Sequence, residues 1–185
     1  AGSWGVDIPP GLEGATDGKL WEVADHDSLA LVEEQVRLMR QWMAERGQQE
    51  KPLIVSEYGI LYRHCAIWRW TGEEYVCDLS FNDGPTVINF MLATFDYLLS
   101  ARDCAIGYVA DGCRLVQRWL WSSLDYTAEG ANIHTRLYEK ADSALTPAGI
   151  ADRDWVIANR AKLAEPIPTD DLARLFLPSV TKARE

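Results

Sequence analysis

Residues 51–62, K-P-L-I-V-S-E-Y-G-I-L-Y, predict a short buried strand that ends in a carboxylate. Leu53, Ile54 and Val55 form a continuous apolar run, which is typical of a strand covered on both faces in the parallel sheet of an α/β protein. Because side chains alternate along a strand, Leu53, Val55 and Glu57 are expected to share one face. If that face points to the axis of a parallel barrel, Glu57 lies at the carboxyl-terminal rim, where such barrels carry their chemistry.

The string P-L-I-V-S-E-Y-G, residues 52–59, resembles the seventh strand of retaining glycoside hydrolases of the large (β/α)8 clan that includes cellulase-like and mannanase-like enzymes. The match is one short motif, and the order of the predicted elements on both sides agrees with it. The resemblance implies that Glu57 is the catalytic nucleophile. The alternative is a capping or ion-paired surface residue at a strand end. Gly59 is expected to let the chain turn out of the strand.

The length of the chain bounds the fold. Its 185 residues suffice for one domain with a sizeable core, but a complete (β/α)8 barrel takes about 250 residues. The resemblance places Glu57 on strand seven, yet only 56 residues precede it. The resemblance therefore implies an α/β fold that is the carboxyl-terminal portion of a (β/α)8 TIM barrel, whose first five or six strands lie upstream. Residues 1–163 are assigned to the barrel domain, and residues 164–185 to a linker or tail.

Composition narrows the class of partner. The net charge is −10, and no Lys/Arg cluster is present to neutralise phosphates, which argues against nucleic acid. No apolar run reaches the about 20 residues of a membrane span, so no membrane partner is expected. The expected partners are a carbohydrate substrate and the upstream half of the barrel. No cofactor and no metal are expected.

The four cysteines fall into two local pairs. Cys65 and Cys77 flank a predicted hairpin, and Cys104 and Cys113 flank a short loop. Neither spacing matches a zinc ribbon or a C-x-x-C redox site. Two local disulfides in a secreted enzyme are predicted; the alternative is four reduced, partly buried thiols.

The other elements follow in an order that suits the end of a barrel. An amphipathic helix is predicted from Asp27, its cap, to residue 46, with Gly47 as the stop and with Met39 and Met43 on its apolar stripe. Residues 1–23 are expected to be a loop. The remaining predicted elements are a helix over 86–100, a strand over 114–125 and a helix over 148–162. In the barrel, the helix that ends at residue 46 would be helix six. The elements over 86–100, 114–125 and 148–162 would be helix seven, strand eight and helix eight.

Aromatic residues cluster around the predicted catalytic end. Tyr62, Trp68, Trp70 and Tyr75 lie in the long connection after the strand of Glu57, where aromatic density suits a polysaccharide groove. The alternative for this connection is a small satellite core. The resemblance implies that Trp121, at the end of strand eight, is the floor of the subsite beside the nucleophile, with Trp119 as the second choice. A core role is the alternative for both tryptophans and the preferred one for Trp119.

Retaining hydrolysis needs a second carboxyl group about 5 to 5.5 Å from the nucleophile, to protonate the leaving oxygen. The resemblance places that group in an Asn-Glu pair ending strand four, and the sequence contains no Asn-Glu dipeptide. Glu73 and Glu74 could substitute only if their loop folded back over Glu57. The chain alone is therefore expected to be inactive, with its acid/base residue in the upstream half.

Two other interpretations stay open. The chain could be a non-catalytic carbohydrate-binding or structural half barrel, which would tolerate Glu57→Gln with effects on binding alone. It could also be a half barrel that associates with itself, because the exposed edges of a small sheet must be covered.

Overall fold

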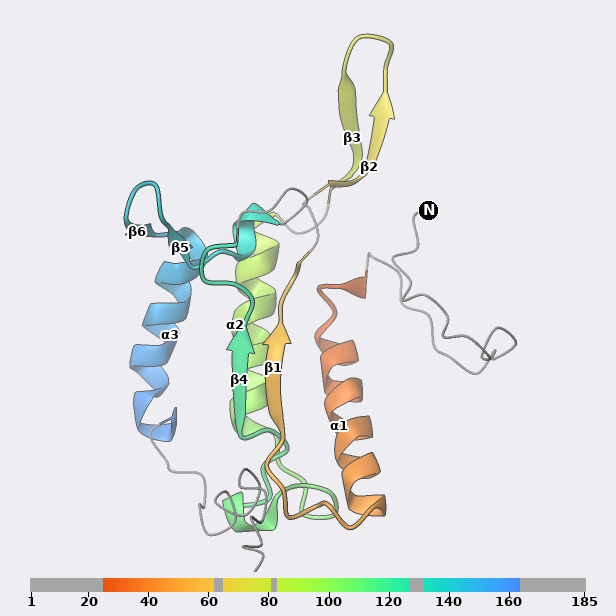
Figure 1. The fold of residues 1–185 in the computed structure, drawn as a ribbon, viewed down its shortest axis with the longest axis vertical. Helices are drawn as coiled ribbons and strands as arrows, with labels where there is room; N and C mark the ends of the chain where they lie inside the picture. Colours follow the sequence, from red (N-terminus) through yellow and green to blue (C-terminus); the bar gives the residue numbers. More distant parts are fainter. Residues whose placement is uncertain (1–24, 62–64, 81–82, 127–131, 164–185) are drawn as a thin grey trace, which may run out of the picture.

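The computed structural model describes residues 25–61, 65–80, 83–126 and 132–163, with side chains of the β-hairpin at 65–80 described for 69–76 only. The protein has a mixed α/β fold (Figure 1). Its helices are α1 (Leu29–Glu45), α2 (Gly84–Ser100) and α3 (Pro147–Leu163), with short 3-10 helices η2 (Val109–Asp111) and η3 (Ile133–Thr135). Its strands are β1 (Ile54–Tyr58), β2 (Cys65–Trp70), β3 (Tyr75–Ser80), β4 (Arg118–Trp121), β5 (Tyr138–Glu139) and β6 (Ala144–Leu145). These strands form three two-stranded sheets, and the described residues form no closed barrel.

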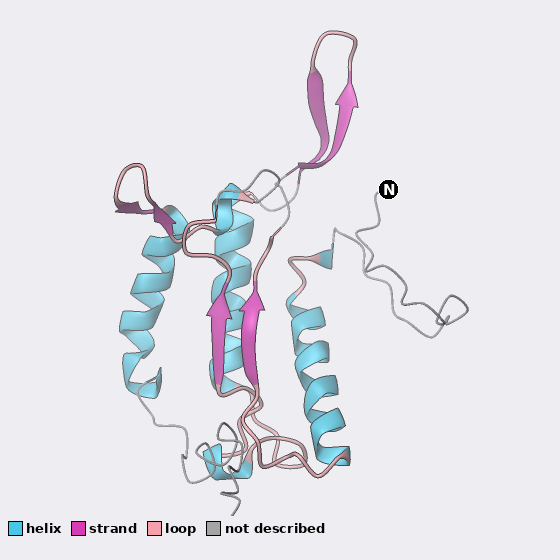
Figure 2. Cartoon of the chain, viewed as in Figure 1, coloured by secondary structure: helices cyan, strands magenta, loops and turns pink. Residues whose placement is uncertain are grey.

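The centre of the fold is the parallel pair β1–β4 (Figure 2). Opposed residues are Ile54 and Arg118, Val55 and Trp119, and Tyr58 and Trp121. The chain passes from β1 to β4 through α2, and a helical crossover is the usual connection between parallel strands. The predicted α/β class is therefore confirmed for this unit.

Helix α2 confirms its predicted buried face. Its N-cap is Asp83, whose side chain accepts a hydrogen bond from the backbone N–H of Thr86 at 2.8 Å, and Pro85 occupies the first turn. The predicted apolar stripe is buried in full and comprises Val87, Met91, Phe95 and Leu98. This face packs against the β1–β4 pair and against α3.

Helix α1 differs from its prediction in two details. Ser28 rather than Asp27 occupies the cap position, and it makes no side-chain capping hydrogen bond. Met43 is buried, whereas Met39 is 46% exposed because it faces a hollow beside β1. Gly47 follows the helix with a φ of +65°, the left-handed conformation that a glycine stop predicts.

Strand β4 is shorter than the predicted strand over 114–125. The chain at Arg114 still belongs to the preceding loop, where its backbone bridges to Arg102 and Tyr108. The Arg114 guanidinium also binds the Asp111 carboxylate at 2.8 Å. Because of these local contacts, the strand begins only at residue 118.

The predicted hairpin is present as β2 and β3. Its backbone register sets Trp70 opposite Tyr75 and Trp68 opposite Cys77. Figure 1 shows the hairpin projecting beyond the carboxyl end of β1, away from the helices. The side chains of Trp68 and Cys77 lie outside the described residues, so their predicted roles stay predictions.

Of the two predicted disulfides, Cys104–Cys113 is present, with an S–S distance of 2.08 Å. The side chain of Cys65 and all of Tyr62 lie outside the described residues, as do the predicted loop over 1–23 and tail over 164–185. No helix in the described part of the chain combines the length and the apolar character needed to cross a membrane.

Candidate functional site

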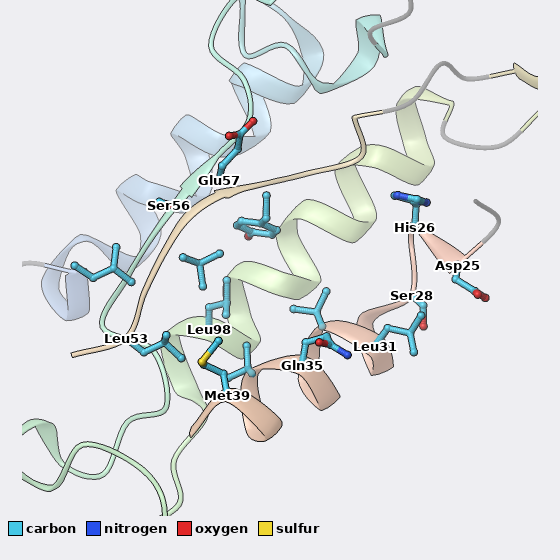
Figure 3. A pocket seen from close by; sticks show the side chains of 15 residues that line it. Asp25, His26, Ser28, Leu31, Gln35, Met39, Leu53, Ser56, Glu57 and Leu98 are labelled. Carbon is cyan, nitrogen blue, oxygen red and sulfur yellow. The ribbon is translucent and has the colours of Figure 1, made fainter. Parts of the chain in front are cut away.

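Glu57 lies on the exposed side of β1, at its carboxyl end. Leu53 and Val55 instead pack against the cluster of Val36, Leu98, Leu115 and Val116 on the helical side. In Figure 3, Leu53 points toward Leu98, whereas Glu57 points away from α1 and α2. The prediction that Leu53, Val55 and Glu57 share one face is therefore wrong.

A register irregularity explains the change of face. Between its pairings at Val55 and Tyr58, β1 advances three residues, whereas β4 advances two, from Trp119 to Trp121. The extra residue interrupts the alternation, so that Tyr58 returns to the helical side. Glu57 thus reaches the exposed side of the pair.

The carboxyl ends of β1 and β4 are held in close contact by Gly59. A Cβ at this position would lie 2.6 Å from the backbone oxygen of Ser122, closer than van der Waals contact allows. The Ser122 N–H donates a hydrogen bond to the Tyr58 carbonyl at 2.8 Å. The φ of Gly59 is not in the left-handed region. The chain bends at Gly59 directly after β1, as predicted, and the missing side chain of Gly59 also permits the close approach of the two strands.

Tyr58, the residue after Glu57, anchors β1 to helix α2. Its hydroxyl lies 3.1 Å from the Thr94 hydroxyl. Burial raises the pKa of Tyr58 well above its ordinary value, and the hydrogen bond with Thr94 opposes that rise only in part. Its ring meets the indole of Trp121 edge to face, with centroids 5.4 Å apart. These contacts of Tyr58 hold the backbone next to Glu57 in place.

The two predicted substrate tryptophans lie on the helical side of β4. The Trp121 indole contacts Phe90 and Phe95, and its Nε1–H donates to the Thr135 carbonyl at 2.9 Å. Trp119 lies between Phe95 and Trp155, with ring centroids 5.8 and 6.1 Å away. Both side chains are half-buried, and these contacts belong to the core.

A hollow of about 530 Å³ separates α1 from β1, and we call it the α1–β1 groove. Apolar side chains line most of it, including Leu31 and Met39 of α1 and Leu53 and Val55 of β1. Its polar lining residues include Asp25, His26, Ser28, Gln35, Ser56 and Glu57. Figure 3 shows His26 in the segment before α1 and Glu57 on β1, with the Glu57 carboxylate pointing away from α1. The groove follows the edge of β1 that β4 does not occupy.

The opposite end of the strand pair carries a buried polar network that the sequence did not reveal. Arg40 is fully buried, and its guanidinium donates to the carbonyls of Leu115 and Lys51 and to Oε1 of Gln117. Gln117 also accepts from the Leu53 N–H at 2.7 Å. Burial lowers the pKa of Arg40 to about 10, so the guanidinium stays charged at neutral pH.

A second carboxylate at the carboxyl end of β4 also escaped prediction. Asp125 follows the strand, and its Oδ1 is buried without a hydrogen-bond partner. Sequence position gave one signal, since Asp125 is the last residue of the predicted strand eight. No cluster of three His, Cys, Asp or Glu side chains that could hold a metal ion occurs in the described part of the chain.

Comparisons with protein-family models, with curated proteins and with solved structures find no match to this chain. The candidate site is a carboxylate on the exposed side of a parallel strand pair, at the carboxyl end of its strand. No described hydrogen bond or ion pair occupies Glu57, so its carboxylate is available to a ligand.

Proposed function

We propose that the chain is the carboxyl-terminal portion of a (β/α)8 barrel that hydrolyses O-glycosidic bonds in an oligo- or polysaccharide with retention of configuration. The observation that carries the proposal is the place of Glu57. It is the penultimate residue of a strand in a parallel pair and lies on the side opposite the helices (Figure 3). In a (β/α)8 barrel, that side faces the axis and that end carries the catalytic residues.

The uncovered surface of the strand pair supports a barrel. Ile54 and Leu120 lie on the side away from the helices and are 44% and 56% exposed. Apolar side chains in these positions would form the packed interior of a closed barrel. If the hairpins β2–β3 and β5–β6 are taken as connections, the remaining elements α1, β1, α2, β4 and α3 alternate as helices and strands do in a barrel.

The α1–β1 groove supports the same fold and has a different role from a substrate cleft. A helix that precedes a strand in a barrel follows another parallel strand, and the two strands lie side by side. The free edge of β1 and the apolar walls of the groove suit that preceding strand, supplied by the upstream half of the barrel. The sugar would instead bind over Glu57, at the rim.

The chemistry assigns Glu57 the attack on the anomeric carbon. Its carboxylate oxygen forms a bond to that carbon as the bond to the leaving oxygen breaks, and an acid protonates the leaving oxygen. Water, deprotonated by the same second carboxyl group, then releases the sugar and restores Glu57. The sequence has no Asn-Glu pair for the second group, so the proposal places it in the upstream half, and the isolated chain is inactive.

The test uses the barrel completed with its upstream strands and a 2-deoxy-2-fluoro glycoside that traps the glycosyl-enzyme. Intact mass and peptide mapping should place the label on the peptide that contains Glu57. Glu57→Gln should lower kcat at least about 1,000-fold. The matched control is Glu50→Gln, an exposed glutamate before β1, which should retain activity.

A second candidate is a carbohydrate-binding half barrel without covalent chemistry. The missing Asn-Glu pair favours it. It predicts no label across a panel of fluorinated sugars, with carbohydrate binding intact in both the wild-type and Glu57→Gln proteins. That result would overturn the hydrolase proposal.

A further inference from the structure

We propose that the tip of the β2–β3 hairpin is a binding platform for the pyranose rings of a neutral polysaccharide. This inference rests on the proposed function, because it extends the sugar site beyond Glu57. The platform consists of Trp70 and Tyr75, the last residue of β2 and the first residue of β3.

The two rings are exposed far more than a structural pair requires. Trp70 is 54% exposed and Tyr75 is 67% exposed. They lie directly opposite each other across the hairpin, with ring centroids 5.0 Å apart and planes inclined at 53°. The contact between the two rings stabilises the hairpin, as a cross-strand aromatic pair does. That contact leaves more than half of each side chain in water, available to a ligand.

The turn between the rings holds them in a fixed geometry. The Thr71 N–H donates to the Glu74 carbonyl at 2.9 Å, and the Thr71 hydroxyl accepts from the Glu74 N–H at 3.2 Å. Gly72 has a φ of +104°, a backbone conformation that residues with a side chain rarely adopt. A ligand that binds the rings therefore loses little free energy in ordering them.

The chemistry around the rings selects the occupant. An aromatic face packs against the apolar C–H side of a pyranose. Glu73 and Glu74 are exposed beside the rings and can accept hydrogen bonds from sugar hydroxyls. The same carboxylates, on a chain with a net charge of −10, repel anionic polymers. A neutral polysaccharide satisfies all three conditions.

The location of the hairpin connects the platform to the proposed active site. The hairpin follows β1 in sequence and projects from the carboxyl end of β1 (Figure 1). Glu57 lies at that same end. One polysaccharide chain could therefore contact the platform and extend toward Glu57, with the platform holding the part of the polymer that is not cleaved.

The experiment is affinity electrophoresis of the full chain in gels that contain hydroxyethylcellulose, glucomannan or polygalacturonate. The wild-type chain should be retarded by at least one neutral polymer and not by polygalacturonate. The double variant Trp70→Ala/Tyr75→Ala should lose at least about 10-fold in affinity. The control is Trp42→Ala, since Trp42 is 49% exposed but its ring is covered by the Arg46 guanidinium at 4.5 Å.

Two further variants keep the outcome interpretable. Trp70→Phe/Tyr75→Phe retains both rings and should retain binding, which separates ring loss from misfolding. Glu57→Gln should bind as the wild type does, so a failure of hydrolysis leaves this test intact. Equal retardation of the double variant and the wild type, or no retardation in either neutral polymer, would overturn the platform. Slow migration that depends on Trp70 in a gel without polysaccharide would assign the pair to a protein contact instead.

Discussion

At the amino-terminal end of the β1–β4 pair, Arg40 is fully buried, and its guanidinium is bound by three acceptors from the two segments that lead into β1 and β4. At the carboxyl end, Glu57 is exposed, and its carboxylate has no described partner. The charge of Arg40 is bound inside the protein, whereas the charge of Glu57 is exposed at its surface. In a parallel barrel, the amino-terminal end of the strands supports stability and the carboxyl-terminal end carries the chemistry. The two ends of the β1–β4 pair differ in the same way.

The largest effect on stability should come from the buried end. Arg40→Met removes the donor to Leu115, Lys51 and Gln117 and leaves buried acceptors unpaired. We expect the free energy of unfolding to fall by about 3 kcal/mol, measured by urea denaturation. Arg37→Met is the matched control on the same helix, because its contact with Asp103 at 3.0 Å is exposed. That control should cost less than about 1 kcal/mol, and equal losses would erase the proposed contrast.

The contact between the strands at the carboxyl end should give a smaller loss. Gly59→Ala places a methyl group 2.6 Å from the Ser122 backbone oxygen and forces β1 away from β4. We expect a loss of about 2 kcal/mol in urea denaturation. At Gly84, the nearest atom to an added Cβ is Nδ1 of His134 at an ordinary 3.6 Å. Gly84→Ala is thus the control, and a loss there as large as at Gly59 would contradict the close-approach explanation.

The smallest effect should be a dependence on alkaline pH. Burial raises the pKa of Tyr58, so above pH about 10 the unfolded chain loses this proton while the folded chain keeps it. Stability is therefore fully present below pH 10 and falls as pH rises, by up to about 1.4 kcal/mol per pH unit. Tyr58→Phe should flatten that slope in urea denaturation at pH 9 to 11. Burial also raises the pKa of Tyr97, so part of the slope should remain.

The exposed Tyr126 provides the control for this measurement. Tyr126→Phe should leave the alkaline slope as it is in the wild type. If Tyr58→Phe also left the slope unchanged, Tyr58 would not be the buried anchor beneath Glu57.

Sequence patterns predicted the features that depend on neighbouring residues. The stripe of α2 repeats at helical spacing, and the hairpin at Trp70 and Tyr75 is bounded by a Thr-Gly turn, so both could be found locally. The side of β1 on which Glu57 lies could not be predicted locally, because the register irregularity that changes it depends on pairing with β4. Arg40 also escaped prediction, since helical periodicity treats every arginine as an outward residue. Its partner Gln117 lies 77 positions away.

The free edge of β1 also bears on how the chain behaves while it is being made. Until a neighbouring strand arrives, its backbone N–H and C=O groups can pair with any extended segment, including the same strand of another molecule. The L-I-V run at residues 53–55, where β1 begins, is the kind of apolar, uncharged sequence that seeds such aggregates. Lys51 and Glu57 flank this run and act as charged gatekeepers against it. The glutamate that we assign to catalysis would therefore also protect the nascent protein from self-association.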